Sequence, residues 1–285
     1  MDIMQTHSTF MPDNSPKYPP HHEGHLIEQF AYQFFYYTPV KTNRMYLPIY
    51  WTNYWIARMC PSGYRPDAGA QAYVQQIIDT NPGRRFMTIS QLDDGIRVNF
   101  PECLKFSSGG IGDIPIPLLC SPHRTTLKPR PKYLASFAGS IWGRHRIREK
   151  MYNAVCSKPG IFLNPQGGDP GRSAFFADIM SDSVFSLCPR GYGKTSFRIC
   201  EAVHIGSIPV YIYDDPWMPF KDRIDWNSFC VLVPENEISS LYDRLASISQ
   251  DKIRDMRNNL INIKRYFTMQ GCCETIKDIL EKLND

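Results

Sequence analysis

The segment Cys188-Pro-Arg-Gly-Tyr-Gly-Lys-Thr-Ser-Phe-Arg-Ile-Cys-Glu201 decides how the C-terminal half of this sequence is interpreted. The apolar run at 183–188 predicts a buried strand, and residues 196–205 predict a helix that stops at Gly206. A second apolar run at 208–213 follows directly. A strand, a glycine-containing loop, a helix and a strand in this order are typical of a βαβ unit on a parallel sheet.

The same alternation extends outward from this segment. Further strands are predicted at 85–90, 133–138 and 230–233, and helices at 69–79 and 147–155. Apolar residues three and four apart predict an amphipathic helix over 251–267, and 273–283 repeats the pattern more briefly. We expect the many aromatic residues between 26 and 57 to be mostly core.

The length of 285 residues favours two domains. Residues 1–25 are rich in proline and histidine and predict a flexible arm. The charged, proline-rich stretch 127–132 is interpreted as a stiff interdomain linker. The sequence therefore predicts an α/β protein with two domains.

Composition excludes several classes of protein. The content of 42% hydrophobic and 21% charged residues is ordinary for a globular chain. A net charge of +4 without long basic runs argues against a nucleic-acid partner. The N-terminus has no apolar signal region, and no stretch approaches the ~18 apolar residues of a membrane helix. We expect a soluble, cytoplasmic protein.

The nine cysteines are an odd count without C-x-x-C spacing, and no Cys/His pair is interpreted as a zinc site. We expect them to be small buried hydrophobic residues in a reducing compartment. His21, His22 and His25 could bind a metal, but a solvated arm is the favoured interpretation. No metal site is predicted.

Gly193-Lys-Thr195 between a strand and a helix suggests a P-loop, which would make the chain an NTPase. That motif needs a glycine five residues before the second glycine, and Cys188 stands there. A P-loop-like NTPase is therefore a minor alternative.

The segment can still bind phosphate without the first glycine of a P-loop. Helix N-termini stabilise anions, and Arg190 or Lys194 can add a charge-assisted hydrogen bond. The residues that let the loop turn and that cap the helix are Gly191, Gly193, Thr195 and Ser196.

Arg198 and Glu201 lie three residues apart on one helical face. One interpretation is a surface ion pair. In the other, Glu201 accepts hydrogen bonds from ribose hydroxyls while Arg198 orients it or contacts phosphate. Asp214-Asp215 follows the next strand, at the edge where α/β sheets place ligands.

On these motifs the sequence resembles the exostosin family of glycosyltransferases. The resemblance is carried by Phe185–Gly191, Thr195–Arg198, Glu201-Ala202, Gly206, Ile208-Pro-Val210, Pro219-Phe220 and Ile224-Asp-Trp226, and it continues through Ile248-Ser to Met256-Arg257. Weaker matches are Tyr46–Trp51 (an early aromatic-proline strand), Ser90–Gly95, Phe137–Gly139 and Ile147-Arg148.

The resemblance implies a GT-B type fold, with two Rossmann-like domains facing across a cleft. Residues 26–130 would be the N-terminal acceptor-binding domain and 131–265 the C-terminal nucleotide-sugar donor-binding domain. We also expect a C-terminal helix over 266–285 that packs back on the N-terminal domain.

The resemblance also implies site residues and a reaction that inverts the anomeric carbon. Arg148, Arg190 and Ser196 would contact the donor diphosphate, Glu201 the ribose, and Asp93 would face the cleft. Leu92 departs from the family, which has histidine before this aspartate. Most eukaryotic members carry a membrane anchor, and none is expected here. In this respect we expect the chain to resemble short soluble members in large DNA viruses or microbes.

No Asp-x-Asp, the usual metal-binding motif of metal-dependent transferases, occurs in the sequence. We therefore expect no required metal or other cofactor, and expect cationic side chains and a helix N-terminus to stabilise the leaving diphosphate. Asp93 is the first candidate for the base and Asp94 the second, although either could simply cap the turn before Gly95. The donor is expected to be a UDP-sugar, with a weak preference for UDP-xylose, and the acceptor a glycan or glycoprotein hydroxyl.

One alternative from a different class stays open beside the NTPase. The chain could be a non-catalytic partner subunit of another glycosyltransferase, and Leu92 leaves room for this role.

Overall fold

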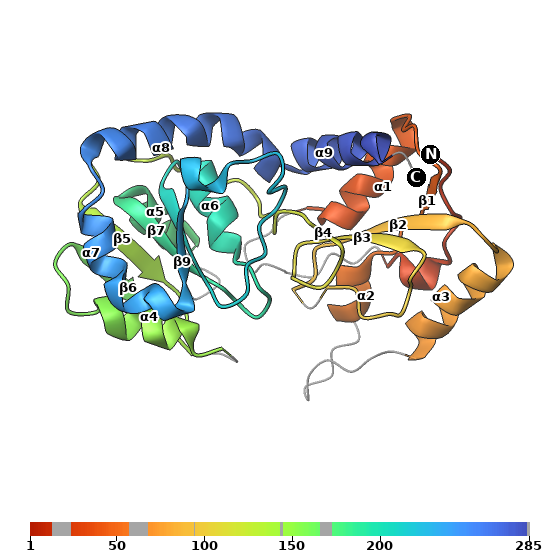
Figure 1. The fold of residues 1–285 in the computed structure, drawn as a ribbon, viewed down its shortest axis with the longest axis horizontal. Helices are drawn as coiled ribbons and strands as arrows, with labels where there is room; N and C mark the ends of the chain where they lie inside the picture. The colour runs from red at the N-terminus through yellow and green to blue at the C-terminus, as the bar shows by residue number, and fades with distance from the viewer. Residues whose placement is uncertain (13–23, 57–67, 94, 143–144, 166–172, 284–285) are drawn as a thin grey trace. The chain divides into compact units, whose positions relative to one another are not determined.

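The computed structural model describes residues 1–12, 24–56, 68–93, 95–142, 145–165 and 173–283. The chain divides into two compact units, drawn in Figure 1. Unit 1 contains the described residues up to Leu119 and those from Thr268 onward, and unit 2 is Cys120–Phe267. Unit 1 is therefore built from two separate stretches of chain.

Unit 2 is an α/β unit around a five-stranded sheet with the order β6-β5-β7-β8-β9, in which every pair is parallel. Its strands are β5 (Tyr133–Ala138), β6 (Ile161–Asn164), β7 (Ser183–Pro189), β8 (Ile208–Tyr213) and β9 (Val231–Pro234). Its helices are α4 (Ile147–Val155), α5 (Ser173–Ser181), α6 (Phe197–Ile205), α7 (Leu241–Ala246) and α8 (Gln250–Ile263), with 3-10 turns η3 (Trp226–Ser228), η4 (Glu235–Ser240) and η5 (Lys264–Phe267).

The strand order contains one reversal, between β5 and β7. The chain moves outward from β5 to β6 and then back across the sheet to β7. Since right-handed crossovers in opposite directions place their helices on opposite faces, α4 and α5 cover different faces. In agreement, α4 packs against η4 and α7, whereas α5 packs against α6. Doubly wound sheets bind ligands outside the carboxyl ends of the strands at such a reversal.

Local sequence signals define α6. The Ser196 side chain accepts a hydrogen bond from the backbone N–H of Arg198 at the N-cap. Gly206 ends the helix with φ of 95°, a left-handed conformation that favours glycine. The predicted strand–loop–helix–strand segment is thus confirmed, with β7 one residue longer than expected.

Unit 1 contains a four-stranded parallel sheet in the sequential order β1-β2-β3-β4. Its strands are β1 (Arg44–Tyr46), β2 (Arg85–Ser90), β3 (Cys103–Ser107) and β4 (Ile114–Pro115). Its helices are α1 (Ile27–Tyr37), α2 (Trp51–Ile56), α3 (Ala68–Thr80) and α9 (Met269–Lys282), with the 3-10 turn η1 (Ser8–Phe10). The predicted α/β class with parallel strands is confirmed in both units.

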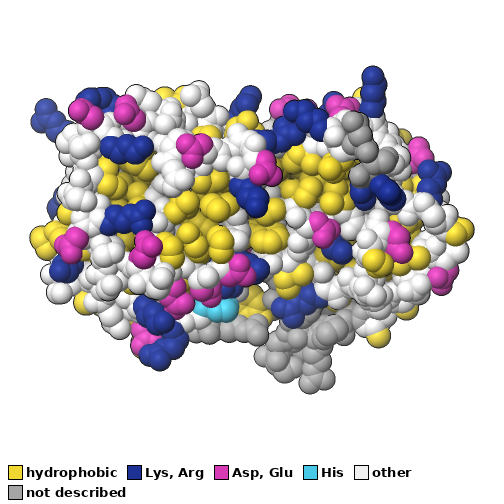
Figure 2. All heavy atoms as spheres, in the orientation of Figure 1, with side chains coloured by type: hydrophobic (Ala, Val, Ile, Leu, Met, Phe, Trp, Pro, Cys, Tyr) yellow, Lys and Arg dark blue, Asp and Glu magenta, His cyan; other side chains and the backbone are white. Residues whose placement is uncertain are grey.

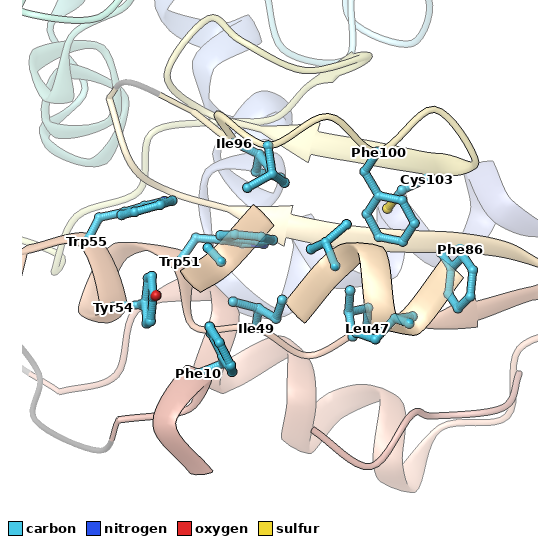
Figure 3. Close-up of a cluster of buried hydrophobic side chains, with 14 of the residues drawn as sticks. Phe10, Leu47, Ile49, Trp51, Tyr54, Trp55, Phe86, Ile96, Phe100 and Cys103 are labelled. Atoms are coloured by element: carbon cyan, nitrogen blue, oxygen red, sulfur yellow. The ribbon is translucent and has the colours of Figure 1, made fainter. Parts of the chain in front are cut away.

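The core of unit 1 is aromatic, as the sequence predicts. Phe86, Phe100 and Cys103 gather at one end of the cluster in Figure 3, and the rings of α2 lie at the other. The Trp51 indole N–H donates to the Thr88 hydroxyl at 2.9 Å, so this buried ring also has its polar atom satisfied. The stretch 46–51 is a strand only at its first residue, and a helix begins at its last.

Residues 1–12, interpreted from the sequence as part of a flexible arm, pack on unit 1 instead. Ile3 forms a parallel bridge with Tyr46, and the N-terminal ammonium donates to the Val40 carbonyl at 2.7 Å. Phe10 is buried and stacks on Tyr73 with a centroid separation of 4.1 Å. This aromatic anchor explains the difference. His21 and His22 lie outside the described residues.

The expected linker at 127–132 is bonded to unit 2. The backbone N–H of Leu127 donates to the Ile205 carbonyl at 2.8 Å, and that of Lys128 to the Ser181 carbonyl at 2.9 Å. Asp182 accepts from both the Lys128 ammonium and the Lys132 backbone. Interpreting the stretch as a free interdomain linker is wrong, because its amides find partners at the ends of α5 and α6.

The expected helix over 251–267 changes character before its end. The α-helix stops at Ile263, and η5 continues to Phe267 as a tighter 3-10 turn. The C-terminal helix α9 begins at the Thr268 cap, earlier than the expected residue 273, and packs against α1 within unit 1. Its buried residues are Cys272, Cys273, Thr275, Ile276 and Leu280.

The cysteines agree with the predicted buried role. No disulfide joins the described cysteines, and only Cys156 among them is exposed. Cys60 lies outside the described residues. Basic and acidic side chains are interspersed over the face shown in Figure 2, which is unlike the single-sign stripe of a nucleic-acid protein. Within the described ranges, no helix combines the length and apolar character that crossing a membrane requires.

Candidate donor-binding site

The loop between β7 and α6 lies at the carboxyl end of the sheet, beside the strand reversal. The backbone N–H of Gly191 donates to the Thr195 carbonyl at 2.8 Å and closes the loop. Gly193, Thr195 and Ser196 are buried. The first turn of α6 opens from this loop, so its N–H groups and dipole create a favourable place for an anion.

Arg190 organises the loop from the inside. Its side chain is only 8% exposed. The guanidinium Nε donates to the Gly193 carbonyl at 3.0 Å, and Nη1 donates to Asp214 Oδ1 at 2.5 Å. A longer contact of 3.4 Å reaches the Tyr192 carbonyl. Arg190 therefore connects the loop to the end of β8 while its positive charge stays within the loop.

Arg148 connects the two sides of the reversal. This residue lies on α4, and its Nε donates to the Arg190 carbonyl at 3.0 Å while Nη1 donates to the Ser140 carbonyl at 3.1 Å. A Cβ at Gly191 would lie 3.3 Å from Arg148 Nη2, so glycine leaves room for this side chain. The loops after β5 and β7 are thus held together by one cation.

Arg198 has a different environment from the other two arginines. Its Nη2 donates to the Ala138 carbonyl at 2.5 Å, and the guanidinium lies over the rings of Phe137 and Phe176 at 4.6 and 5.1 Å. Burial lowers the pKa of this guanidinium, although nearby Glu201 acts in the opposite direction. Glycine at position 139 leaves room for this side chain, because a Cβ there would lie 2.1 Å from Arg198 Nη2. The structure encloses Arg198 under the loop after β5.

Glu201 is buried on the same helix, so a surface ion pair with Arg198 is excluded. Glu201 pairs with His123, whose Nε2 lies 3.6 Å from Oε1. Both side chains are less than a tenth exposed. His123 could not be predicted from a motif, because it lies 78 residues before Glu201 and outside any regular element.

The two aspartates after β8 face the cations of the loop. Asp214 contacts Arg190 and also lies 3.9 Å from His145 Nδ1. Burial alone would raise the pKa of Asp214, but the Arg190 hydrogen bond and charge outweigh it and hold the pKa below its usual value. Asp215 pairs with Lys194 at 2.6 Å, and the Lys194 ammonium lies 5.4 Å from the centre of the Trp217 ring. The predicted edge residues of β7 and β8 are thus brought together.

Asp93 lies in unit 1, in the loop at the carboxyl end of β2, and is partly exposed. The backbone N–H of Gly95 donates to the Leu92 carbonyl at 2.8 Å and forms a turn around Asp93. A Cβ at Gly109 would lie 2.2 Å from the Asp93 carbonyl oxygen, so the loop after β3 supports this turn closely. Asp94 lies outside the described residues.

A buried carboxyl holds the start of the Asp93 loop. Oε1 of Glu28 accepts from the Gln91 backbone N–H at 3.0 Å, from the Thr52 backbone at 3.1 Å and from the Thr52 hydroxyl at 2.5 Å. Burial raises the pKa of Glu28 despite these hydrogen bonds. Glu28 was not predicted from the sequence, because an acidic residue in the first turn of a helix is usually a surface residue that interacts favourably with the helix dipole.

Fold and site together define the class: an α/β protein with two parallel sheets, the larger of which carries a basic loop and a helix N-terminus at its reversal of strand order. Residues 107–248 match the Exostosin GT47 domain. The chain belongs to the exostosin family of glycosyltransferases.

Curated relatives support this assignment. The chain is 37% identical over 143 residues to a probable glycosyltransferase of Arabidopsis thaliana, covering 50% of this chain and 28% of the relative. It is 40% identical over 152 residues to a probable glucuronosyltransferase of Oryza sativa subsp. japonica, covering 50% and 36%. An exostosin-1 homolog of Caenorhabditis elegans is 34% identical over 88 residues, covering 31% and 23%. The chain thus spans well under half the length of these relatives.

Solved structures with low sequence identity also align with the chain. WaaG, a glycosyltransferase involved in lipopolysaccharide biosynthesis, is 10% identical with a TM-score of 0.42, and the alignment covers 90% of this chain and 94% of WaaG. The GtfA/B complex is 10% identical with a TM-score of 0.48, covering 90% of this chain and 59% of the solved chain.

Proposed function

We propose that the chain is a glycosyltransferase that moves a sugar from a nucleotide-diphosphate donor to a hydroxyl of a glycan or glycoprotein. Family membership supports the reaction class. The observation that carries the proposal is the loop of residues 190–196, where a helix N-terminus and two arginines lie at the strand reversal of unit 2.

In this proposal the donor diphosphate lies at the start of α6. Arg148 and Arg190 hold the loop through backbone carbonyls and contribute positive charge beside it. Preorganised positive charge stabilises a diphosphate as its negative charge grows during departure. No required metal is therefore part of the proposed donor chemistry. Glu201, buried beyond this first turn, is the proposed acceptor of hydrogen bonds from the ribose hydroxyls.

The proposed donor is a UDP-sugar. UDP-xylose is the weak first preference, and UDP-glucuronate belongs in the same screen because a rice relative is named a probable glucuronosyltransferase.

Inversion at the anomeric carbon requires a base that removes the proton of the acceptor hydroxyl. Asp93 is the proposed base, and Asp94 is the second candidate. The partly exposed position of Asp93 at the carboxyl end of β2 allows it to meet a substrate hydroxyl.

The test begins with a thermal-shift screen of nucleotide sugars in buffer without added Mg²⁺ or Mn²⁺. A ligand that binds only the folded state stabilises it by mass action, by about 2.7 kcal/mol at a free concentration of a hundred times Kd. This stabilisation raises the melting temperature. Donors that bind are then incubated with glycan acceptors, and nuclear magnetic resonance gives the anomeric configuration of the product. Failure of every nucleotide sugar to bind contradicts the proposal.

Asp93→Asn tests the base directly. We expect the variant to bind donor as the wild type does and to lose transfer, whereas Asp79→Asn, on α3, leaves both unchanged. Near-normal turnover of Asp93→Asn rules out Asp93 as the base. Donor binding by the wild type without hydrolysis or transfer supports the non-catalytic partner subunit, which Leu92 in place of the family's histidine favours.

A further inference from the structure

A buried cluster of two thiols and one imidazole lies in unit 2, apart from the donor loop. Cys120, Cys200 and His204 are all buried, and one potential ligand atom from each lies within 4.8 Å of the others. Cys200 and His204 come from α6, and Cys120 is the first residue of the unit. The proposed donor chemistry uses none of the three.

The helix presents two of these ligands together. Residues four apart lie one above the other on the same face of a helix, which is how Cys200 and His204 meet. The Cys200 Sγ lies 3.9 Å from His204 Nε2. Two ligands of a tetrahedral zinc ion, at about 2.3 Å for sulfur and about 2.0 Å for nitrogen, are separated by about 3.5 Å. The side chains therefore need only a small adjustment to share one ion.

A backbone oxygen lies beside two of these ligand atoms. The Phe267 carbonyl oxygen lies 2.8 Å from His204 Nε2 and 3.6 Å from the Cys200 Sγ. The 3.6 Å separation is close to the sulfur–oxygen spacing around a tetrahedral zinc ion, whereas the 2.8 Å contact is a hydrogen bond that would lengthen by about 0.5 Å when both atoms bind one ion. The carbonyl belongs to the last residue of η5, where the tight 3-10 turn brings it toward α6.

The cluster also has unusual polar chemistry for a hydrophobic core. His204 directs Nε2 at Cys200 and at the Phe267 carbonyl, and a neutral imidazole can leave this nitrogen free of a proton by holding the proton on Nδ1. The thiolate is the form of cysteine that ligates metals.

We propose that Cys120, Cys200 and His204 bind one thiophilic divalent cation, with the Phe267 carbonyl as the fourth ligand. Two thiolates and an imidazole match the preferences of Zn²⁺, and a closed, buried set of four ligands is typical of a structural rather than a catalytic site. Binding releases the protons that the two thiols carry. The ion would join the first and last residues of unit 2 to the helix that carries the donor-site residues.

The experiment measures metal in the full chain, purified under reducing conditions and equilibrated with a small excess of Zn²⁺ before desalting. Elemental mass spectrometry is expected to give about one zinc per chain, as one four-ligand site requires. Co²⁺ in its place should give the intense absorption of a tetrahedral cobalt–thiolate centre. Cys200→Ser and His204→Gln should each lower the bound zinc at least tenfold.

Cys230→Ser is the matched control, because Cys230 is also a buried thiol of unit 2 but lies outside the cluster. It should retain the wild-type zinc content. Less than a tenth of an equivalent of zinc in the reduced wild type overturns the proposal, as does equal loss in Cys230→Ser. If Cys200→Ser fails to fold, the cobalt spectrum of the wild type decides: absence of the thiolate band rejects the site. A Cys120–Cys200 disulfide in air-purified protein, with no zinc bound after reduction, also rejects it.

Discussion

Replacing Arg190 by alanine should destabilise unit 2 strongly, because the side chain holds the donor loop from within. The variant loses the hydrogen bonds from Nε to the Gly193 carbonyl at 3.0 Å and from Nη1 to Asp214 at 2.5 Å. Hydrogen bonds with a charged partner contribute about 1.5–3 kcal/mol each. Because the Asp214 side chain is 31% exposed and water can replace part of its contact, we expect a loss of about 3 kcal/mol.

For a unit of this size, a loss of 1 kcal/mol lowers the melting temperature by about 2–4 °C, so Arg190→Ala should lower it by about 6–12 °C. Differential scanning calorimetry or fluorimetry gives this shift. Arg190→Lys should lose about half as much, because an ammonium can still attract Asp214 but cannot also reach the Gly193 carbonyl. Affinity for UDP, measured by titration calorimetry, should fall in both variants.

Arg244→Ala is the control for removing an arginine from an ion pair. Its pair with Glu237 is 3.1 Å long but lies on the surface, with side chains 41% and 50% exposed. Such pairs contribute less than about 1 kcal/mol. If Arg190→Ala shifts the melting temperature no more than Arg244→Ala does, Arg190 does not hold the loop and the reasoning is refuted.

The pH dependence gives an independent check on the Arg190–Asp214 pair. Since the folded-state pKa of Asp214 is lowered, the stability from this pair is present above the unfolded pKa of about 3.9 and is lost as pH falls through the lower folded value. The difference in stability between wild type and Arg190→Ala should therefore shrink below about pH 4. A constant difference from pH 7 to pH 3 would argue against the pair.

The buried carboxyl of Glu28 and the closely packed Gly109 and Gly139 can each be tested by one substitution. Because burial raises the folded pKa of Glu28, its contribution to stability is most favourable below the unfolded value of about 4.3 and is lost as pH rises through the folded pKa. Glu28→Gln should flatten this part of the stability–pH profile. An unchanged dependence of the unfolding free energy on pH, measured by urea titrations, would reject the raised pKa. Gly109→Ala places a Cβ 2.2 Å from the Asp93 carbonyl oxygen. The kcat of the proposed transfer should therefore fall at least tenfold, while donor affinity measured by calorimetry is unchanged. Equal loss of kcat and donor affinity would show that the effect is not confined to the Asp93 loop. Gly139→Ala places a Cβ 2.1 Å from Arg198 Nη2 at a φ of +150° and should cost about 2–4 kcal/mol of stability in denaturant titrations; a loss below 1 kcal/mol would mean that the enclosed arginine relocates easily.

The part of the fold that the sequence predicted best is the segment from β7 to β8. Its boundaries depend on local signals, since the Ser196 cap and the left-handed Gly206 act within a few residues of the helix ends. Apolar runs located the flanking strands for the same reason. Local chemistry is visible in one sequence, and this segment is mostly local.

The errors arise where distant segments decide the conformation. Phe267 fits the apolar spacing of a continuous helix, yet the chain tightens into η5, where its carbonyl accepts from His204 and the Lys264 ammonium donates to the His204 carbonyl. Residues 127–132 have the composition of a linker, but their amides bond to α5 and α6 partners that lie far away in sequence. Neither set of contacts produces a pattern in the neighbouring sequence.

The candidate site shows the same division. Their spacing predicts that Arg198 and Glu201 lie on one face of a helix. In the folded chain Arg198 donates to the Ala138 carbonyl, whereas Glu201 pairs with His123. The Cys200–His204 pair was visible as residues four apart and was not recognised, because its third member, Cys120, lies 80 residues earlier.

The discontinuity of unit 1 has a consequence for the order of folding during synthesis. Unit 2 is complete once Phe267 has been made, whereas unit 1 still lacks α9, whose buried face includes Cys272, Ile276 and Leu280. Until those residues emerge, the surface of α1 against which α9 packs stays uncovered. Domains usually fold in the order of their synthesis. Here the unit that begins first should finish last, and a chain truncated before Thr268 should leave an aggregation-prone N-terminal unit beside a folded C-terminal one.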